Sequence, residues 1–414
     1  MSSVAWLRLL LIFTLGVAHI SFWIWLFNRV NSLALERKAI KRLEKSVVLL
    51  CLTLPFFLFL IEWRYGTWGR SWQQLWDHFQ EPDFYRRGSI GTLVYFGVVL
   101  AFLAWIGPQW LAHRPIFAIA KNRYRTLHQG FERNLHRRNP TWVTGSMTRA
   151  CLAIPGNEIM DLETNVKRIY LDNLNAAFVG MRIGHFSDIH LMGQIAPEFT
   201  RYCVDWMIAH GAELLVLSGD LVDDPKAIPH LETALGGLPS DIPKYFVLGN
   251  HERAHGLVDA ARDSMVALGW LDAGAQDWQN PTKRGVVQVF GNERPWLDRH
   301  RAVDSGGPGV DRRRGLLLGI AHSPDQFSWA RSVGCHVLLC GHNHGGQIRV
   351  PAIGPIVSPS RYGSRYASGI FFRSPTLMHV SRGVSGTHPW RWRCSPEASL
   401  LELAQAPSGR DDLR

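Results

Sequence analysis

MRIGHFSDIH, residues 181–190, joins a short apolar run to two metal-binding side chains. An apolar run of this length that is bounded by glycine predicts a buried strand over Met181–Phe186. The run stops at Asp188 and His190, a carboxylate and an imidazole of the kind that bind divalent metals. In open α/β sheets, ligands collect just beyond the C-terminal ends of the strands. The stretch therefore predicts a strand that delivers metal ligands to one edge of a sheet.

Four more runs of this kind follow in the chain. The runs and the residues at their ends are Leu214–Leu217 with Asp220, Tyr245–Leu248 with Asn250 and His251, Leu316–Ile320 with His322, and Val337–Cys340 with His342 and His344. Any one of them is weak evidence, because a lone histidine is more often a hydrogen-bonded structural residue than a ligand. Five strand ends that present two Asp, one Asn and five His together predict a site for two metals and a phosphate.

Phosphate ester hydrolysis explains this choice of side chains. Two divalent cations about 3.5–4 Å apart acidify a water between them and clamp the oxygens around phosphorus. A single carboxylate can bridge such a pair, and Asp220, at the end of the second run, is the natural candidate. One histidine should stay off the metals to protonate the leaving oxygen, and His251 suits that role.

The five blocks resemble those of the calcineurin-like metallophosphoesterases. They stand here as SDIH (187–190), GDLVDD (219–224), GNHE (249–252), AHSPD (321–325) and GHNHGGQ (341–347). The resemblance implies a first metal held by Asp188, His190, Asp220 and His344, and a second held by Asp220, Asn250, His322 and His342. It also implies that His251 is the general acid. It runs from about 165 to 403 and is closest to a branch with a GHTHGGQ block, from which Asn343 departs.

The fold that the resemblance implies is α/β, a four-layer α/β/β/α sandwich with two sheets packed face to face and helices outside. Helix-like patterns over Ala196–His210 and Leu257–Leu268 fit the outer layers. The metals are expected to be manganese, iron or zinc, which imidazole, carboxylate and amide ligands all suit.

Two regions are candidates for substrate binding. Gly291–Gly315 is polar and rich in arginine, so Arg294 and Arg299 suit phosphate oxygens, although a solvated charged loop explains them equally well. Gly345 and Gly346 leave the backbone beyond His344 open to a phosphate. Ser360–Tyr366 (SRYGSRY) is a further candidate for contact with the substrate.

The first third of the chain predicts a membrane region. Three apolar stretches, Ala5–Phe27, Val47–Trp63 and Ile90–Ala112, predict three spans, of which the second is the shortest and contains Pro55. A signal peptide is the rival interpretation of the first stretch, but its apolar part is too long and no cleavage site follows it. An N-terminal α-helical membrane region over 1–112, and an integral protein of an inner or plasma membrane, are therefore expected.

Basic residues predict the orientation of these spans. The loop after the first span and the segment after the third are rich in Lys and Arg, whereas the loop between the second and third is diluted by acids. The positive-inside rule then places the catalytic domain in the cytoplasm. The six cysteines form no C-x-x-C pair, which fits a reducing compartment and argues against a disulfide framework.

The formal charge of +11 over 414 residues is unevenly distributed, and Arg114–Arg138 is a basic cluster. An amphipathic helix on anionic lipid explains this cluster best beside a membrane span, a solvated linker helix is the plain alternative, and nucleic-acid binding is not expected. The expected organisation is a basic juxtamembrane linker over 113–150, the metallophosphoesterase domain over 151–404 and a tail over 405–414. No pattern in the sequence indicates an oligomeric state.

Tethering beside a membrane suits a substrate that is held in the same leaflet. The site itself indicates a phosphomonoester, a phosphodiester or a pyrophosphate. The branch that the chain resembles includes enzymes that cleave UDP-2,3-diacylglucosamine in lipid A synthesis, so this lipid-linked substrate is the leading expectation. Another envelope or nucleotide phosphoester is one alternative, and a non-catalytic metal-binding membrane scaffold is another.

Overall fold

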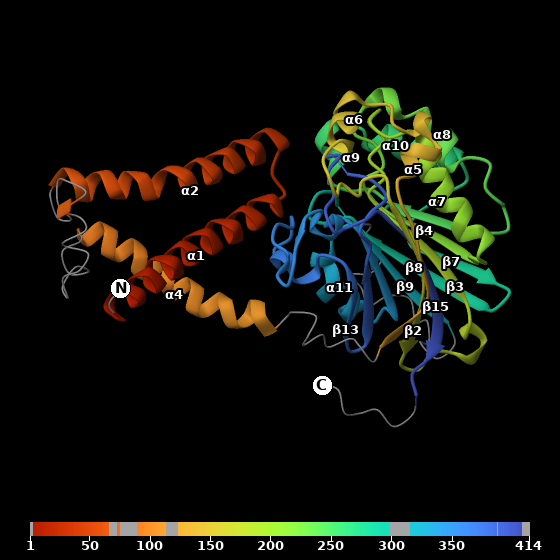
Figure 1. Cartoon of the computed structure of the whole chain (residues 1–414). Helices are drawn as coiled ribbons and strands as arrows, with labels where there is room; N and C mark the ends of the chain where they lie inside the picture. The colour runs from red at the N-terminus through yellow and green to blue at the C-terminus, as the bar shows by residue number, and fades with distance from the viewer. Residues whose placement is uncertain are drawn as a thin grey trace. The chain divides into compact units, whose positions relative to one another are not determined.

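The computed structural model describes residues 3–65, 73–74, 89–112, 123–298, 315–386 and 388–407. The chain divides into two compact units, Met1–Phe117 and Ala118–Arg414. Figure 1 labels the helices of both units and several strands of the second. The six cysteines, all within the described residues, are free thiols, as expected from their spacing.

Among the described residues of the first unit, three helices are long and apolar enough to cross a membrane. They are α1 (Ser3–Asn31), α2 (Arg37–Tyr65) and α4 (Ile90–Ala112). The three predicted spans are thus confirmed as long apolar helices. The second is longer than the apolar stretch suggested, because α2 begins in the basic segment that precedes Val47 and continues through Pro55.

A hydrogen-bond chain across all three helices explains how α2 tolerates its proline. Pro55 has no N–H, so the carbonyl of Cys51, four residues earlier, loses its helical partner. His19 of α1 fills the gap, with its Nε2 2.9 Å from that oxygen. The other ring nitrogen of His19 then accepts from the hydroxyl of Tyr95 on α4 at 2.5 Å. Trp23 donates to the same hydroxyl at 3.1 Å, so each of these hydrogen-bonding groups has a partner.

The second unit is built on two sheets packed face to face. The seven-stranded sheet has the order β1-β2-β15-β3-β4-β5-β6, and the six-stranded sheet has the order β13-β14-β10-β9-β8-β7. The strands of the first sheet are β1 (Tyr124–Glu132), β2 (Leu162–Leu171), β15 (Glu397–Gln405), β3 (Arg182–Phe186), β4 (Leu214–Ser218), β5 (Lys244–Val247) and β6 (Leu271–Asp272). Those of the second are β13 (Gly369–Arg373), β14 (Thr376–Val380), β10 (Val337–Cys340), β9 (Leu316–Ala321), β8 (Gly285–Asn292) and β7 (Trp278–Thr282). A short hairpin of β11 (Arg349–Val350) and β12 (Gly354–Pro355) lies apart from both.

Helices cover the outer faces of this sandwich. They are α5 (Leu135–Arg138), α6 (Ser146–Leu152), α7 (Pro197–Ala209), α8 (His230–Leu235), α9 (Asn250–His255), α10 (Val258–Ala267) and α11 (Phe327–Val333). Short 3₁₀ turns lie at Pro140–Trp142, Ala176–Phe178, Pro225–Ala227, Pro324–Gln326, His344–Gly346 and Gly363–Tyr366. The two helices predicted from sequence correspond to α7 and α10, and the α/β sandwich is confirmed.

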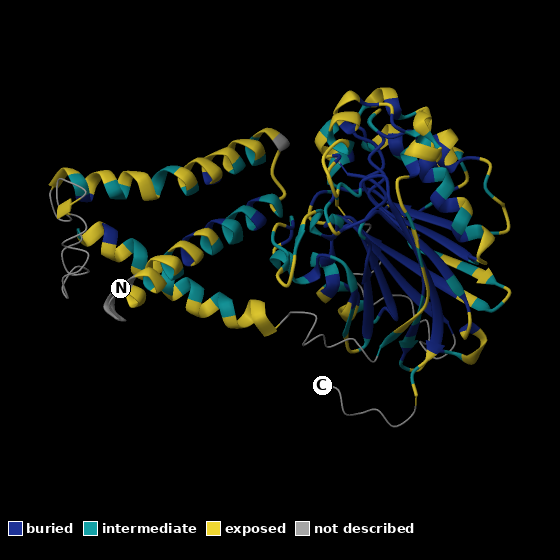
Figure 2. Ribbon diagram, in the orientation of Figure 1, coloured by how far each residue is buried: buried dark blue, intermediate teal, exposed yellow. Residues whose placement is uncertain are grey.

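Strand alternation divides the core into three apolar layers. On β4, Leu214 and Val216 face the other sheet, whereas Leu215 and Leu217 pack under α7, α8 and α10. On the second sheet, Leu317 and its neighbours pack under α11. Because both faces of the central strands are covered, most residues of these strands are apolar, and Figure 2 shows the strands buried. All five predicted strands, β3, β4, β5, β9 and β10, lie in this core.

The prediction of a helix over Arg114–Arg138 is wrong where the structure describes that segment. Tyr124–Glu132 is the edge strand β1, antiparallel to β2 from Tyr124 opposite Ile169 to Glu132 opposite Leu162. The segment expected to be a linker over 113–150 therefore contributes a strand and the helices α5 and α6 to the second unit. The backbone pairing with β2 outweighs the helical pattern of its arginines and aromatics. Residues 113–122 lie outside the described part of the chain.

Candidate metal centre

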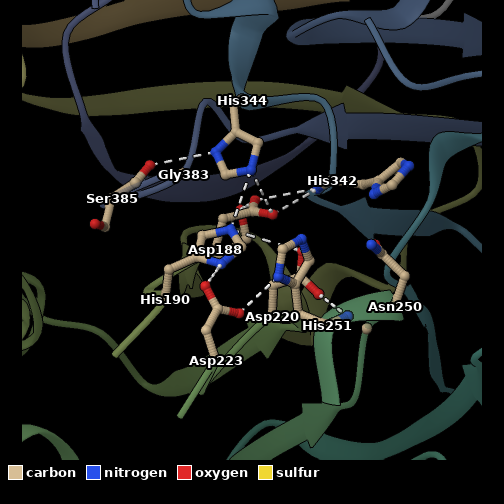
Figure 3. Close-up of polar contacts among 12 residues, drawn as sticks. Asp188, His190, Asp220, Asp223, Asn250, His251, His342, His344, Gly383 and Ser385 are labelled. Atoms are coloured by element: carbon tan, nitrogen blue, oxygen red, sulfur yellow. Dashed lines mark hydrogen bonds and ion pairs between the residues drawn. The ribbon is translucent and has the colours of Figure 1, made fainter. Parts of the chain in front are cut away.

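The strand ends place all eight predicted metal and acid residues in one site. β3, β4 and β5 run parallel in the first sheet, and β9 and β10 run parallel in the second. Their C-terminal ends therefore open at one edge of the sandwich, where the loops after them carry the predicted residues. Figure 3 shows the side chains of Asp188, His190, Asp220, Asn250, His251, His342 and His344 converging there.

The backbone at this edge is strained. Asp188, His190 and Asp220 have positive φ angles of 54°, 42° and 54°, and His342 and His344 have 70° and 47°. This left-handed conformation is unfavourable for residues other than glycine, and such residues cluster at functional sites. The residues with this conformation are among those whose side chains converge in the site (Figure 3).

Two groups of donor atoms meet at Asp220. Asp188, His190, Asp220 and His344 form the first, and Asp220, His322 and His342 form the second, with the donor atoms of each group within 4.8 Å of one another. Asn250 belongs beside the second group, because its Oδ1 lies 3.1 Å from Nε2 of His322. These are the two sets that the resemblance implied, and they share the carboxylate that was expected to bridge.

Hydrogen bonds fix which nitrogen each histidine turns toward the site. Nδ1 of His322 donates to the Ser218 carbonyl at 2.8 Å, and Nδ1 of His344 donates to the Ser385 carbonyl at 3.2 Å. His342 is reversed, with Nε2 donating to the Pro359 carbonyl at 2.7 Å. The remaining nitrogen of each ring is left as an acceptor that faces the other donors. A ring held by an outer acceptor, with its lone pair directed inward, is the usual state of a metal-bound histidine.

These inward lone pairs need a positive charge between them. Nε2 of His190 lies 3.1 Å from Nε2 of His344, and Nδ1 of His342 lies 3.1 Å from Nε2 of His322. Two acceptors at this distance repel each other unless a cation or a proton separates them. Burial alone lowers the pKa of His190, but the carboxylates around it, first among them Asp223, raise it to about 9. A site that attracts a proton so strongly fits divalent cations.

Asp223 is a functional residue that the sequence patterns did not single out. Its carboxylate accepts from Nδ1 of His190 at 3.0 Å and from Nδ1 of His251 at 2.6 Å. Both histidines hold the pKa of this buried carboxyl well below its usual value. Asp223 thus orients a metal-ligand candidate and the acid candidate at once (Figure 3). Its place three residues after Asp220, in the block GDLVDD, was the available signal.

Glu252 holds the turns of the site together. Its buried carboxylate accepts from the backbone of Leu221 at 2.6 Å, Val222 at 3.0 Å and Gly249 at 2.7 Å. The loops that carry Asp220 and Asn250 are therefore tied to one side chain. Gly249 itself must be glycine, since a Cβ there would lie 2.1 Å from Oδ1 of Asp220.

Of the two arginines predicted to bind substrate, the structure describes one. Arg294 is exposed, and its backbone donates to Asn292 and accepts from Gln326. Arg299 and the rest of 299–314 lie outside the described residues. Trp296, which was not predicted, reaches the site, with its ring centroid 4.7 Å from that of His342.

Gly345 and Gly346 pack against protein. A Cβ on Gly345 would meet Cys394 at 2.6 Å, and one on Gly346 would meet Pro355 at 2.5 Å. Close packing with positive φ angles accounts for both glycines, and their contact with substrate stays a prediction. In the SRYGSRY segment, the Ser360 hydroxyl and the Arg361 backbone bind Asp325. The Tyr366 carbonyl accepts from Asn343, the residue that departs from the threonine of the resembling branch.

Residues 181–346 match the family of calcineurin-like phosphoesterases. This part of the chain is a calcineurin-like metallophosphoesterase domain. The metallophosphoesterase match spans every candidate metal residue, from Asp188 to His344. The chain contains a phosphoester hydrolase with His and Asp clusters that are typical of two-metal enzymes of this kind.

The metallophosphoesterase domain has several curated relatives. The uncharacterized metallophosphoesterase YkuE of Bacillus subtilis strain 168 is 27% identical over 251 residues, which are 58% of this chain and 85% of that protein. Phosphodiesterase YaeI of Escherichia coli K12 is 25% identical over 229 residues, 54% of this chain and 82% of that protein. A solved 5'-nucleotidase from Candida albicans aligns with 52% of this chain and 47% of its own, at 13% identity and a TM-score of 0.32, which is too distant to support a conclusion.

Proposed function

We propose that the chain is a membrane-anchored phosphodiesterase that uses two divalent metals to hydrolyse a lipid-linked phosphoester or pyrophosphate. The observation that carries the proposal is the pair of donor groups that share Asp220. In this proposal Asp188, His190, Asp220 and His344 hold one metal, and Asp220, Asn250, His322 and His342 hold the other. Two such ions would supply an acidified water and positive charge around the phosphate.

His251 is proposed as the general acid. Its Nδ1 donates to Asp223, which leaves Nε2 to carry the proton that the leaving oxygen takes. Its side chain is 18% exposed, whereas those of His190 and His322 are fully buried, so His251 is more accessible to a substrate than these two ligand candidates. The backbone N–H of His251 donates to Oδ1 of Asp220 at 3.0 Å, which fixes the acid relative to the bridging carboxylate.

Three long apolar helices in the same chain support a substrate that is held in a membrane. YaeI is named a phosphodiesterase, which supports a diester over a monoester. The printed names of the relatives specify no lipid, so UDP-2,3-diacylglucosamine enters the proposal through the sequence resemblance alone. A cytoplasmic site is proposed from the basic loops that flank the first and third helices.

The test is hydrolysis by the full chain in detergent, with Asp220→Ala beside the wild type. Bis(p-nitrophenyl) phosphate is assayed first, with manganese, iron or zinc added separately, and release of p-nitrophenol by the wild type alone is expected. UDP-2,3-diacylglucosamine is assayed next, and UMP release would support the proposed lipid. Turnover of the aryl diester without UMP release would retain the phosphodiesterase and exclude this lipid. Equal turnover by Asp220→Ala would refute the two-metal site.

A further inference from the structure

The segment that follows Asp325 has an unusual charge balance. Residues 326–396 contain eight arginines and no Asp, Glu or Lys. This segment carries His342 and His344 and ends just before β15 (Glu397–Gln405). Four of its arginines, Arg331, Arg361, Arg373 and Arg393, are exposed. Of these, Arg361 and Arg393 lie next in the sequence to the stretches of Pro359 and Cys394, which contact His342 and His344. Asp325, the last acid before it, is engaged by Ser360 and the backbone of Arg361 within the loop. This side of the metal centre therefore favours an anionic partner.

The same segment exposes large apolar side chains. Ile348, Ile353, Val357 and Trp390 are 37%, 39%, 44% and 41% exposed. We call these four residues the apolar rim. They come from the β11–β12 hairpin, the residues beside it and the stretch before Cys394. Exposed apolar groups that are clustered and edged by polar residues mark a binding surface, whereas scattered ones need no explanation.

Backbone contacts join the apolar rim to the metal-ligand candidates. Gly346, two residues after His344, lies against Pro355 and the Val357 carbonyl. Pro359, two residues after Val357, accepts the hydrogen bond from Nε2 of His342. Val357 is thus held between the two histidine turns.

The other half of the apolar rim is joined in the same way. Ile348 pairs with Trp392 in a parallel bridge, and Gln347 donates to the His388 carbonyl at 3.2 Å. Trp390 lies between these two contacts in the sequence. Gly386 lies against both Gln347 and His344, so this half of the rim borders the partly exposed His344.

We propose that the apolar rim binds the acyl chain of the lipid phosphoester while the phosphate lies over the metal centre. The inference rests on the proposed function and narrows its substrate to amphiphiles with an apolar chain next to the scissile phosphate. The chain's three membrane-type helices supply the reason for a lipid occupant, and Arg361 and Arg393 supply the charge that an anionic headgroup or leaflet requires. A water-soluble diester has no apolar chain to bury against the rim, so the rim would not contribute to its binding free energy.

The test compares two substrates that differ only in their apolar chain, hexadecyl p-nitrophenyl phosphate and ethyl p-nitrophenyl phosphate. The full chain is assayed with both in dodecyl maltoside micelles at fixed detergent and metal. Wild type is expected to have the higher kcat/KM with the hexadecyl ester. Ile353→Ser/Val357→Ser is expected to lose about tenfold with that ester, from the lost burial of two side chains, and less than about twofold with the ethyl ester.

A matched control substitutes two valines that are exposed elsewhere, Val266 on α10 and Val286 near the start of β8, which are 55% and 40% exposed. Val266→Ser/Val286→Ser should keep the wild-type ratio between the two esters. Trp390→Ala provides a second, independent variant and should show the same selective loss as the rim double variant.

Three outcomes would overturn the inference. Wild type without a preference for the hexadecyl ester would exclude an acyl-chain site. Rim variants that lose both esters equally would show that these residues only position His342 and His344. Hydrolysis of neither ester by the wild type would remove the proposed function and the rim with it, and is distinguished from the other two outcomes because both of those require turnover by the wild type.

Discussion

Asp223→Asn tests how the two outer hydrogen bonds of the site depend on one carboxylate. Asp223 is buried and accepts from Nδ1 of His190 and Nδ1 of His251. An asparagine of the same shape keeps one acceptor oxygen and presents an N–H where the other oxygen was. One histidine keeps its acceptor. The other faces the N–H of the asparagine, so its Nδ1 must become the acceptor and its proton moves to Nε2, the nitrogen on the metal side of the ring.

The expected loss comes from a single charge-assisted hydrogen bond. Such a bond to a charged group contributes about 1.5–3 kcal/mol, which is about 10- to 150-fold in rate. If His251 loses its partner, kcat should fall by this factor while the protein keeps its metals. If His190 loses its partner, metal affinity should fall by about 10- to 100-fold and activity should return with excess metal.

The assay is hydrolysis of bis(p-nitrophenyl) phosphate across a manganese titration, with bound metal measured by mass spectrometry. Asp224→Asn is the matched control, because it is the same change at the next residue, where the side chain caps a turn by accepting from the Lys226 backbone. An asparagine retains that acceptor, so the control should stay within about twofold of wild type. Asp223→Asn with wild-type turnover and wild-type metal affinity would refute the role assigned to this carboxylate.

Three further predictions concern other parts of the molecule. His251→Asn should lower turnover by about 10²–10⁴-fold, the contribution of a proton donor, with bound metal unchanged; loss of metal would contradict its role as an acid. Burial lowers the pKa of His185 to about 3, whereas the pKa of histidine in the unfolded chain is about 6.5. Between these two pH values the unfolded chain binds a proton that the folded protein does not. The free energy of unfolding therefore decreases as the pH falls below 6.5, by at most about 1.4 kcal/mol per pH unit. His185→Asn should therefore show a smaller drop in Tm between pH 7.5 and 5.5 than wild type, whereas the same change at exposed His128 should not; equal drops would refute this. In the three-helix unit, His19→Phe leaves the carbonyl freed by Pro55 without a partner and should cost about 1–3 kcal/mol in unfolding by SDS, and adding Pro55→Ala should restore most of it; a double variant no more stable than His19→Phe would contradict the hydrogen-bond account.

The sequence predicts the strands and the donor residues of this site well because both depend on local pattern. β4 and β10 are buried on both faces, so each reads as an unbroken apolar run. The ligand candidates follow those runs directly, since the metal centre lies at the strand ends. Asp220 suits the role of shared carboxylate because it follows β4, which lies between β3 and β5, the other two strands of its sheet that carry ligand candidates.

The features that the sequence does not reveal depend on contacts between distant segments. β1 is an edge strand with mostly exposed side chains, and it pairs with β2 about forty residues later, so its arginines and aromatics resemble a surface helix. β15 inserts between β2 and β3 from the far end of the chain. In the sequence, Asp223 cannot be distinguished from the other acids of the GDLVDD block. Its role becomes visible only in the fold, where it accepts hydrogen bonds from His190 and His251. The proximity of Trp296 to His342 likewise depends on a loop whose path the sequence leaves open.

The hydrogen bond from His19 to the α2 backbone has a consequence for how the protein is made. Pro55 leaves one carbonyl of α2 without its helical partner, so we expect α2 to insert poorly into a bilayer by itself. α1 leaves the ribosome first and carries the imidazole that this carbonyl needs. The donor for the Cys51 carbonyl is thus synthesised before α2. An N-terminal truncation that removes α1 would leave this carbonyl without a hydrogen-bond donor when α2 inserts. In the proposed membrane-anchored protein, we therefore expect α1 to assist the insertion of α2 and expect shortened forms without α1 to insert poorly.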